Sequence, residues 1–199
     1  MNLKPLLALA LLASAMKVAS AADLSVSGQI KPASACNLTL SDRGQIDLGE
    51  LSRNDLHATD ETFFVRKLQL LVECKAATKV GVKSIDNRES VYGDFGLGIQ
   101  GSSGRFAIYP FHRFGDGKPL FQLKSWDGIS WRHNGSTVAA DPIYPSELGA
   151  WAEEGALPQA FTTVSTELQL TIHLPPLSDL DLSQQIDLDG SATMELVYL

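Results

Sequence analysis

Hydrophobic and polar residues alternate with a period of two along several stretches of this chain, the pattern of β-strands with one buried face. The two strongest stretches are residues 64–74 and 161–174. The positions predicted to face the core are Leu68, Leu70, Val72 and Cys74 in the first, and Val164, Leu168, Leu170, Ile172 and Leu174 in the second. Both stretches are therefore predicted as strands, and Cys74 is expected on the core side, where it suits a bridge between packed layers.

Shorter stretches with the same pattern predict further strands. They are residues 23–31, 37–40, 45–49, 79–84, 95–100, 105–109 and 120–126. Asp127-Gly128 is typical of the tip of a hairpin turn. Residues 50–62 and 146–153 are each interpreted as containing at most one helical turn. Many short strands, frequent turn signals and almost no helix favour an all-β fold, an antiparallel β-sandwich.

The last stretch, residues 192–199, alternates over its whole length. Ala192, Met194, Leu196 and Tyr198 share one face, and Thr193, Glu195, Val197 and Leu199 share the other. Chain ends usually fray unless a sheet or a partner holds them. This stretch is therefore predicted to be a strand held in place by another element.

The first 21 residues have the features of a signal peptide. Lys4 precedes an apolar run over residues 5–15, and Ala19-Ser20-Ala21 fits a small-residue cleavage site. The apolar run is too short to span a bilayer. We therefore expect residues 1–21 to be removed during export and residues 22–199 to form a single domain.

Charge and cysteine content restrict the partners. Removal of Lys4 and Lys17 leaves 14 basic and 23 acidic residues, a net charge of −9, which argues against nucleic acid as a ligand. In an oxidising compartment the two cysteines, Cys36 and Cys74, favour one disulfide. The alternative, a metal-binding or catalytic cysteine, lacks a nearby histidine or a second cysteine pair.

Motifs for catalysis are lacking in the sequence. The four histidines show no metal-ligand spacing, and no Gly-x-Ser-x-Gly elbow is present. His173 falls on the polar face of its strand, where a solvated side chain is expected. Trp126, Trp131 and Trp151 lie in loop-like sequence and could contact a glycan, although such tryptophans more often cover the edge of a core. We expect no catalytic, cofactor or metal site and no enzymatic activity.

Taken together, these features resemble a known family. The family has four marks that this chain shares. They are a signal peptide, an alternating strand that leads into Cys36, a second cysteine at Cys74, and a terminal alternating strand with Tyr198 in the penultimate position. The chain is similar to subunits of bacterial chaperone–usher fimbriae, and most similar to the beta-fimbrial major-subunit-like group. The likeness is weakest between residues 101 and 158.

The resemblance implies an immunoglobulin-like sandwich that lacks its final strand. A periplasmic chaperone, and later the N-terminal segment of a neighbouring subunit, would fill the groove left open, and an outer-membrane usher would assemble the fimbrium on the cell surface. The groove strand would carry Ala192, Met194, Leu196 and Tyr198, and the Leu199 carboxylate would anchor on the chaperone. A structural role that supports cell adhesion, without a cofactor, is the function implied.

One departure from the family leaves two possibilities open. Only Ala22 and Asp23 precede the first predicted strand, so a separate donor extension is nearly absent. Either that strand is itself the donor, or the subunit donates to none; we favour the first. The candidate donor side chains are Leu24, Val26, Gly28 and Ile30. The main alternative function is a self-complete periplasmic or surface β-sandwich that binds a glycan or protein receptor, and a secreted hydrolase is a weaker one.

Overall fold

The computed structural model of the chain describes residues 35–90, 92–99 and 103–199. The predicted signal peptide and the candidate donor positions Leu24, Val26, Gly28 and Ile30 lie outside the described residues. The described residues all belong to one compact unit.

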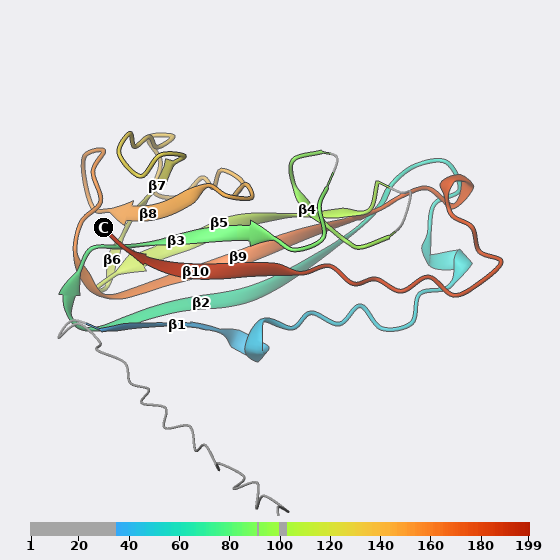
Figure 1. Ribbon diagram of the computed structural model, residues 1–199, viewed down its shortest axis with the longest axis horizontal. Coiled ribbons are helices and arrows are strands. Elements are labelled where there is room, and N and C mark those ends of the chain that lie inside the picture. The colour runs from blue at the N-terminus through green and yellow to red at the C-terminus, as the bar shows by residue number, and fades with distance from the viewer. Residues whose placement is uncertain (1–34, 91, 100–102) are drawn as a thin grey trace, which may run out of the picture. The chain divides into compact units, whose positions relative to one another are not determined.

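Two antiparallel sheets make up this unit, which is an all-β sandwich (Figure 1). The first sheet has the order β1–β2–β9–β5–β4, with β6 paired to β5. Its strands are β1 (Cys36–Leu40), β2 (Thr62–Thr78), β4 (Phe95–Gly96), β5 (Arg105–Gly115), β6 (Lys118–Pro119) and β9 (Phe161–Leu174). The second sheet has the order β10–β3–β8–β7. Its strands are β3 (Val80–Asp86), β7 (Phe121–Ser125), β8 (Leu148–Ala152) and β10 (Ala192–Tyr198).

Helix is limited to three short 3₁₀ turns in the described residues, η1 (Ser41–Gly44), η2 (Arg53–Asp55) and η3 (Leu177–Asp179). No helix in that part of the chain is long and apolar enough to cross a membrane. The turn at η2 confirms the single helical turn predicted within residues 50–62. In η1, Asp42 and Arg43 adopt left-handed backbone angles, which turns the chain away from β2 directly after β1.

The core lies between the two sheets and follows the predicted alternation. β2 and β9 pair from Thr62↔Leu174 to Glu73↔Thr163 and form the centre of the first sheet. The side chains predicted to face inward are buried there, namely Leu68, Leu70 and Val72 on β2 and Val164, Leu168, Leu170, Ile172 and Leu174 on β9. The second sheet contributes Val80, Val82 and Trp151 to the same core.

The predicted disulfide between Cys36 and Cys74 is present. It does not join packed layers as expected, because Cys36 and Cys74 are directly paired residues on the neighbouring strands β1 and β2. The bond therefore staples the edge strand of the first sheet to its neighbour. A disulfide fits a protein that is exported to an oxidising compartment.

Three local predictions were wrong. Residues 146–153 are not a helical turn, because Leu148–Ala152 is strand β8, which pairs with both β3 and β7 and buries Trp151. Residues 45–49 pair with no strand in the described part of the chain, so they form no ladder. The strand predicted over residues 95–100 is reduced to the two residues of β4.

Candidate binding groove

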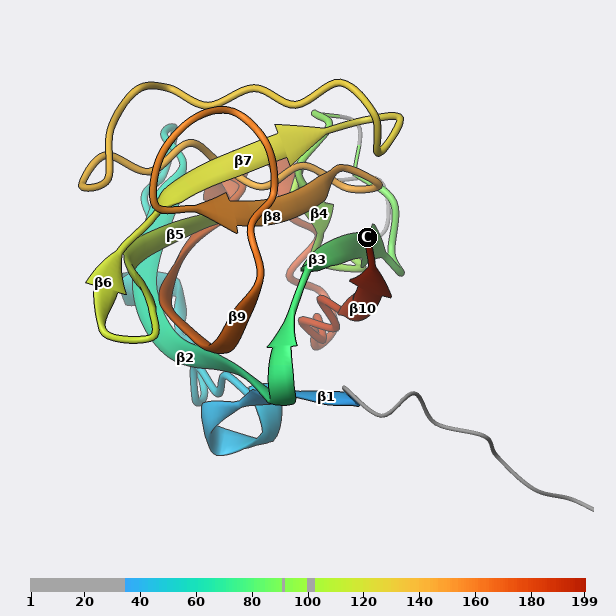
Figure 2. The ribbon, with the colours of Figure 1, turned by 90° about the vertical axis from the view of Figure 1, so that its left-hand side faces the viewer.

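The two sheets each end in a strand with one free edge on the same side of the sandwich, β1 in the first sheet and β10 in the second (Figure 2). Backbone groups alternate in direction along an antiparallel strand. The N–H of Leu199 donates to the carbonyl of Lys79 at 3.1 Å, so odd-numbered residues of β10 bond to β3. The N–H and C=O groups of Met194 and Leu196 therefore point away from β3, where the described part of the chain offers no strand.

The same reasoning applies to β1. The N–H of Lys75 donates to the carbonyl of Ala35 at 3.3 Å, so the odd-numbered residues of this strand face β2. The backbone groups of Leu38 and Leu40 point to the outer edge. Unpaired edges of this kind are templates for an added strand.

A cavity of about 930 Å³ lies between these two edges, and we call it the groove. Its floor is the apolar core of the first sheet, formed by Leu68, Phe106, Ile108, Leu168, Leu170 and Ile172. One side consists of Leu40 and residues 44–56, which we call the wall segment. The opposite side consists of residues 180–194, including Leu180, Leu182, Ile186, Ala192 and Met194.

The wall segment resembles a strand that has no sheet. Ile46, Leu48 and Leu51 pack against the core, with exposed residues between them. Its backbone bonds are local: the N–H of Gln45 donates to the carbonyl of Asp42, and the N–H of Gly49 donates to the carboxylate of Asp47 at 2.8 Å. A strand placed beside it would therefore find backbone groups that no ladder occupies.

The structure places the predicted groove strand as follows. Ala192 and Met194 line the groove, and Leu196 packs against the core beyond its end. Tyr198 is 46% exposed, and its hydroxyl accepts a hydrogen bond of 2.9 Å from the N–H of Cys36. Leu199 is 42% exposed, and Glu195 is exposed on the opposite face.

Sequence reasoning missed the wall segment and residues 180–188 as groove walls. The alternation in Asp179-Leu180-Asp181-Leu182 was a usable signal, since Leu180 and Leu182 are both partly buried in the groove. Gly190 also has a specific role. A Cβ atom at this position would lie 2.8 Å from Leu97 Cδ2 and 3.1 Å from the Phe106 ring, so only glycine lets the chain pass this close to the core.

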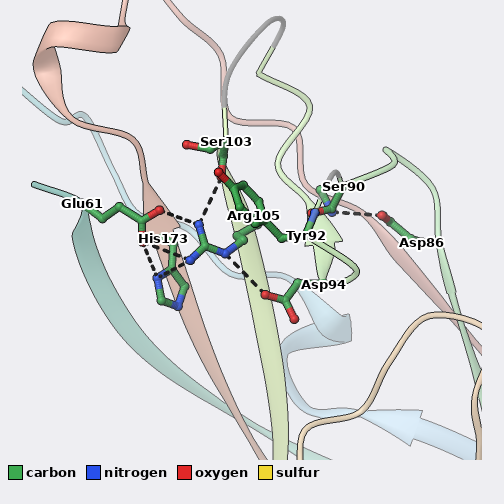
Figure 3. Close-up of polar contacts among 9 residues, drawn as sticks. Glu61, Asp86, Ser90, Tyr92, Asp94, Ser103, Arg105 and His173 are labelled. Carbon is green, nitrogen blue, oxygen red and sulfur yellow. Dashed lines mark hydrogen bonds and ion pairs between the residues drawn. The ribbon is translucent and has the colours of Figure 1, made fainter.

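A charged cluster anchors the chain between the wall segment and β2 (Figure 3). The Glu61 carboxylate accepts two hydrogen bonds from Arg105, at 2.6 and 3.0 Å, and lies 3.2 Å from Nδ1 of His173. Asp94 lies 3.4 Å from Nε of Arg105, whose guanidinium stands over the Tyr92 ring at 4.6 Å. The bonds from Arg105 hold the pKa of Glu61 below its usual range, and the same bonds raise the pKa of Arg105.

This cluster corrects the expectation of a solvated His173, whose side chain is only 21% exposed. Periodicity places a residue on a face of a strand but does not show which side chains of other elements cover that face. The cluster joins Glu61 to Arg105 on β5 and to His173 on β9, so we interpret it as an anchor for the chain that leaves the wall segment. In the described residues, no group of three or more His, Cys, Asp and Glu side chains is arranged to hold a metal ion.

Residues 24–100 match a family described as a protein of unknown function, DUF1120. The match covers β1 to β4 and the wall segment, and it leaves β10 outside. No curated protein matches the chain.

Proposed function

We propose that the chain is a structural subunit of a surface fimbrium that is assembled by a periplasmic chaperone and an outer-membrane usher through donor-strand exchange and supports cell adhesion. The groove carries this proposal. It combines an apolar floor with two free strand edges, and an added strand satisfies both features at once because its backbone pairs while alternate side chains enter the cavity.

The groove determines what such a guest strand needs. The guest strand lies between β10 and the wall segment, and its backbone N–H and C=O groups pair with the outward-pointing groups of Met194. Alternate positions carry apolar side chains toward the floor. Burial of four such side chains at about 1.5–3 kcal/mol each contributes on the order of 10 kcal/mol before ordering costs. Leu24, Val26 and Ile30 of a neighbouring subunit, with Gly28 between them, have the required spacing.

A chaperone has a clear physical role in this scheme. Until a neighbouring subunit fills the groove, its apolar floor and unpaired edges favour aggregation. A strand donated by a chaperone in the periplasm covers both. The Cys36–Cys74 disulfide fits an oxidising compartment such as the periplasm, and it holds β1, one border of the groove, against β2.

Two substitutions on one strand test the proposal. Met194 lines the groove, whereas Glu195 is its exposed neighbour on the other face of β10. Co-expressed in the periplasm with candidate fimbrial chaperones, the natural chain and Glu195→Lys are expected to co-purify with a chaperone. Met194→Lys is expected to lose at least 90% of that complex, because it places an ammonium group in the apolar groove.

Expression of the chain without a chaperone is the second test of the proposal. We expect residues 22–199 alone to be unstable, to aggregate as their concentration rises and to have a low melting temperature. A chain that stays monodisperse at high concentration and melts at the same temperature with and without a chaperone, together with equal chaperone recovery for Met194→Lys and Glu195→Lys, would refute the proposal.

A second candidate function is a self-complete sandwich that binds a glycan or protein receptor. The supporting observation is an aromatic pair, since Trp126 is 58% exposed and stacks on Tyr144 with 6.4 Å between ring centroids. Trp151 cannot take part because it is buried in the core. Binding of a glycan array by the natural chain, abolished in Trp126→Ala, would favour this candidate.

A further inference from the structure

The groove does not run the full length of the gap between β1 and β10. Its lining stops at Leu40 on one strand and at Met194 on the other. Both strands continue beyond these residues, to Cys36 and to Tyr198. We call this continuation the seam. At its far end the Tyr198 hydroxyl accepts the 2.9 Å hydrogen bond from the N–H of Cys36, and this bond connects the two sheets.

The Cys36 N–H points in the direction from which an added strand would pair with β1. Cys36 has the same parity as Leu38 and Leu40, so its backbone N–H points away from β2 and toward β10. A strand added along β1 would place a backbone carbonyl there. The Tyr198 hydroxyl oxygen therefore occupies the position that a carbonyl oxygen of an added strand would take.

We propose that Tyr198 is a clasp that keeps the seam shut in the unfilled subunit, and that a guest strand displaces it to extend the groove as far as Cys36. This inference rests on the proposed function, because it requires a guest strand. It adds an autoinhibitory contact, because the Tyr198 hydroxyl and the guest strand compete for the same backbone donor, the N–H of Cys36.

The hydrogen bond of the clasp can break without a movement of β10. The ring is about half exposed, so it can rotate into solvent around its own side-chain bonds. β10 stays in place when it does so, because β10 is held to β3 through odd-numbered residues such as Leu199, whose N–H bonds to Lys79. One neutral hydrogen bond corresponds to about a two- to tenfold change in an equilibrium constant, enough to slow a partner without excluding it.

Tyr198→Phe tests the clasp, because it removes the hydroxyl and keeps the ring. The probe is a synthetic peptide of residues 22–32, and its binding to residues 22–199 is measured by fluorescence anisotropy for the natural chain, Tyr198→Phe and the matched control Tyr109→Phe. Tyr109 lies on β5, away from the groove. We expect Tyr198→Phe to bind the peptide about two- to tenfold more tightly, and Tyr109→Phe to bind it like the natural chain.

The possible outcomes separate the two proposals. Equal affinity of Tyr198→Phe and the natural chain would overturn the clasp and leave the proposed function standing. No peptide binding by any of the three proteins would overturn the proposed use of this segment as a guest, and the clasp with it. A second measurement needs no variant. Nitration of Tyr198 in the natural chain, mapped by mass spectrometry, should become faster when the peptide is bound, and an unchanged or slower rate would overturn the clasp.

Discussion

At the scale of single residues, Cys36 has two tasks at the end of the seam. Its side chain bonds to Cys74 on β2, and its backbone N–H donates to Tyr198 on β10. The disulfide closes a loop with a sequence separation of 38 residues. Because that loop contains the wall segment, the crosslink limits how far one border of the groove can wander in the unfolded chain.

Replacing both cysteines by serine is therefore expected to lower the free energy of unfolding by about 4 kcal/mol, the value that the loop-closure account gives for a loop of this length. Urea unfolding of the peptide-saturated protein measures the change. Reduction of the natural chain should lower the urea midpoint as far as the double substitution does. A midpoint that neither treatment changes contradicts the prediction.

The anchor at Glu61 makes stability depend on pH. Arg105 lowers the pKa of Glu61 in the folded state, so the unfolded chain binds this proton first as the pH falls. The contribution of ionised Glu61 to the free energy of unfolding is complete above the usual glutamate pKa of about 4.3. It is lost as the pH falls through the lower pKa of the folded state. We expect Glu61→Gln to cost about 1 kcal/mol at pH 7.

The same substitution should flatten the loss of stability as the pH falls below about 4.3, the unfolded glutamate pKa. Thermal unfolding across this range measures the slope. Asp60→Asn is the control, because Asp60 is exposed and next to Glu61. If both variants lose stability with acid as steeply as the natural chain, Glu61 is not a source of the acid sensitivity.

At the scale of elements, periodicity predicted strands well wherever one face is buried and the other polar. Phe161–Leu174 was predicted to the residue, because its burial alternates from Val164 to Leu174 at the centre of the first sheet. β8 was missed because the small residues Gly149, Ala150 and Ala152 supply no contrast between its faces. Residues 45–49 have the pattern of a strand but lack a partner, and pairing is not encoded in the local pattern.

The residues of the groove were likewise predicted only where the local sequence alternates. The Met194 side of β10 was predicted from its own alternation, whereas the wall segment was not, because its role depends on elements far away in sequence. A strand-like segment with only local hydrogen bonds has a measurable property. We expect backbone amides of residues 45–51 to exchange rapidly with solvent, near the rate of an open loop, while those at the centre of β2 and β9 exchange slowly.

Adding the peptide of residues 22–32 should slow exchange in residues 45–51 by at least tenfold, because their amides acquire a ladder partner. Hydrogen exchange with mass spectrometry resolves this segment from β2. Protection of β2 alone would show that the peptide binds elsewhere.

At the scale of the whole molecule, the sandwich has the free edges of β1 and β10 on one side and carries an acidic charge. A ligand that binds only the folded state raises stability by mass action. At a hundredfold excess over its dissociation constant, the peptide is expected to add about 2.7 kcal/mol, which raises the melting temperature by about 5–10 °C in a domain of this size.

Differential scanning fluorimetry measures this shift. The control is the same peptide with Val26 and Ile30 replaced by aspartate, which keeps the backbone donors but removes two apolar side chains. Equal shifts for both peptides would show that the groove does not select for apolar side chains.

The pairing of β2 with β9 joins residues that lie 83 to 112 positions apart in sequence. Contacts of such long range make folding slow, because the ends of a long loop must meet before any ladder bond forms. During synthesis β2 emerges well before its partner, and the apolar side chains of its inward face then have no sheet to cover them, namely Phe64, Leu68, Leu70 and Val72. The time for which this strand stays unpaired, rather than the final stability of the sandwich, therefore sets how long the nascent chain needs shielding from its neighbours.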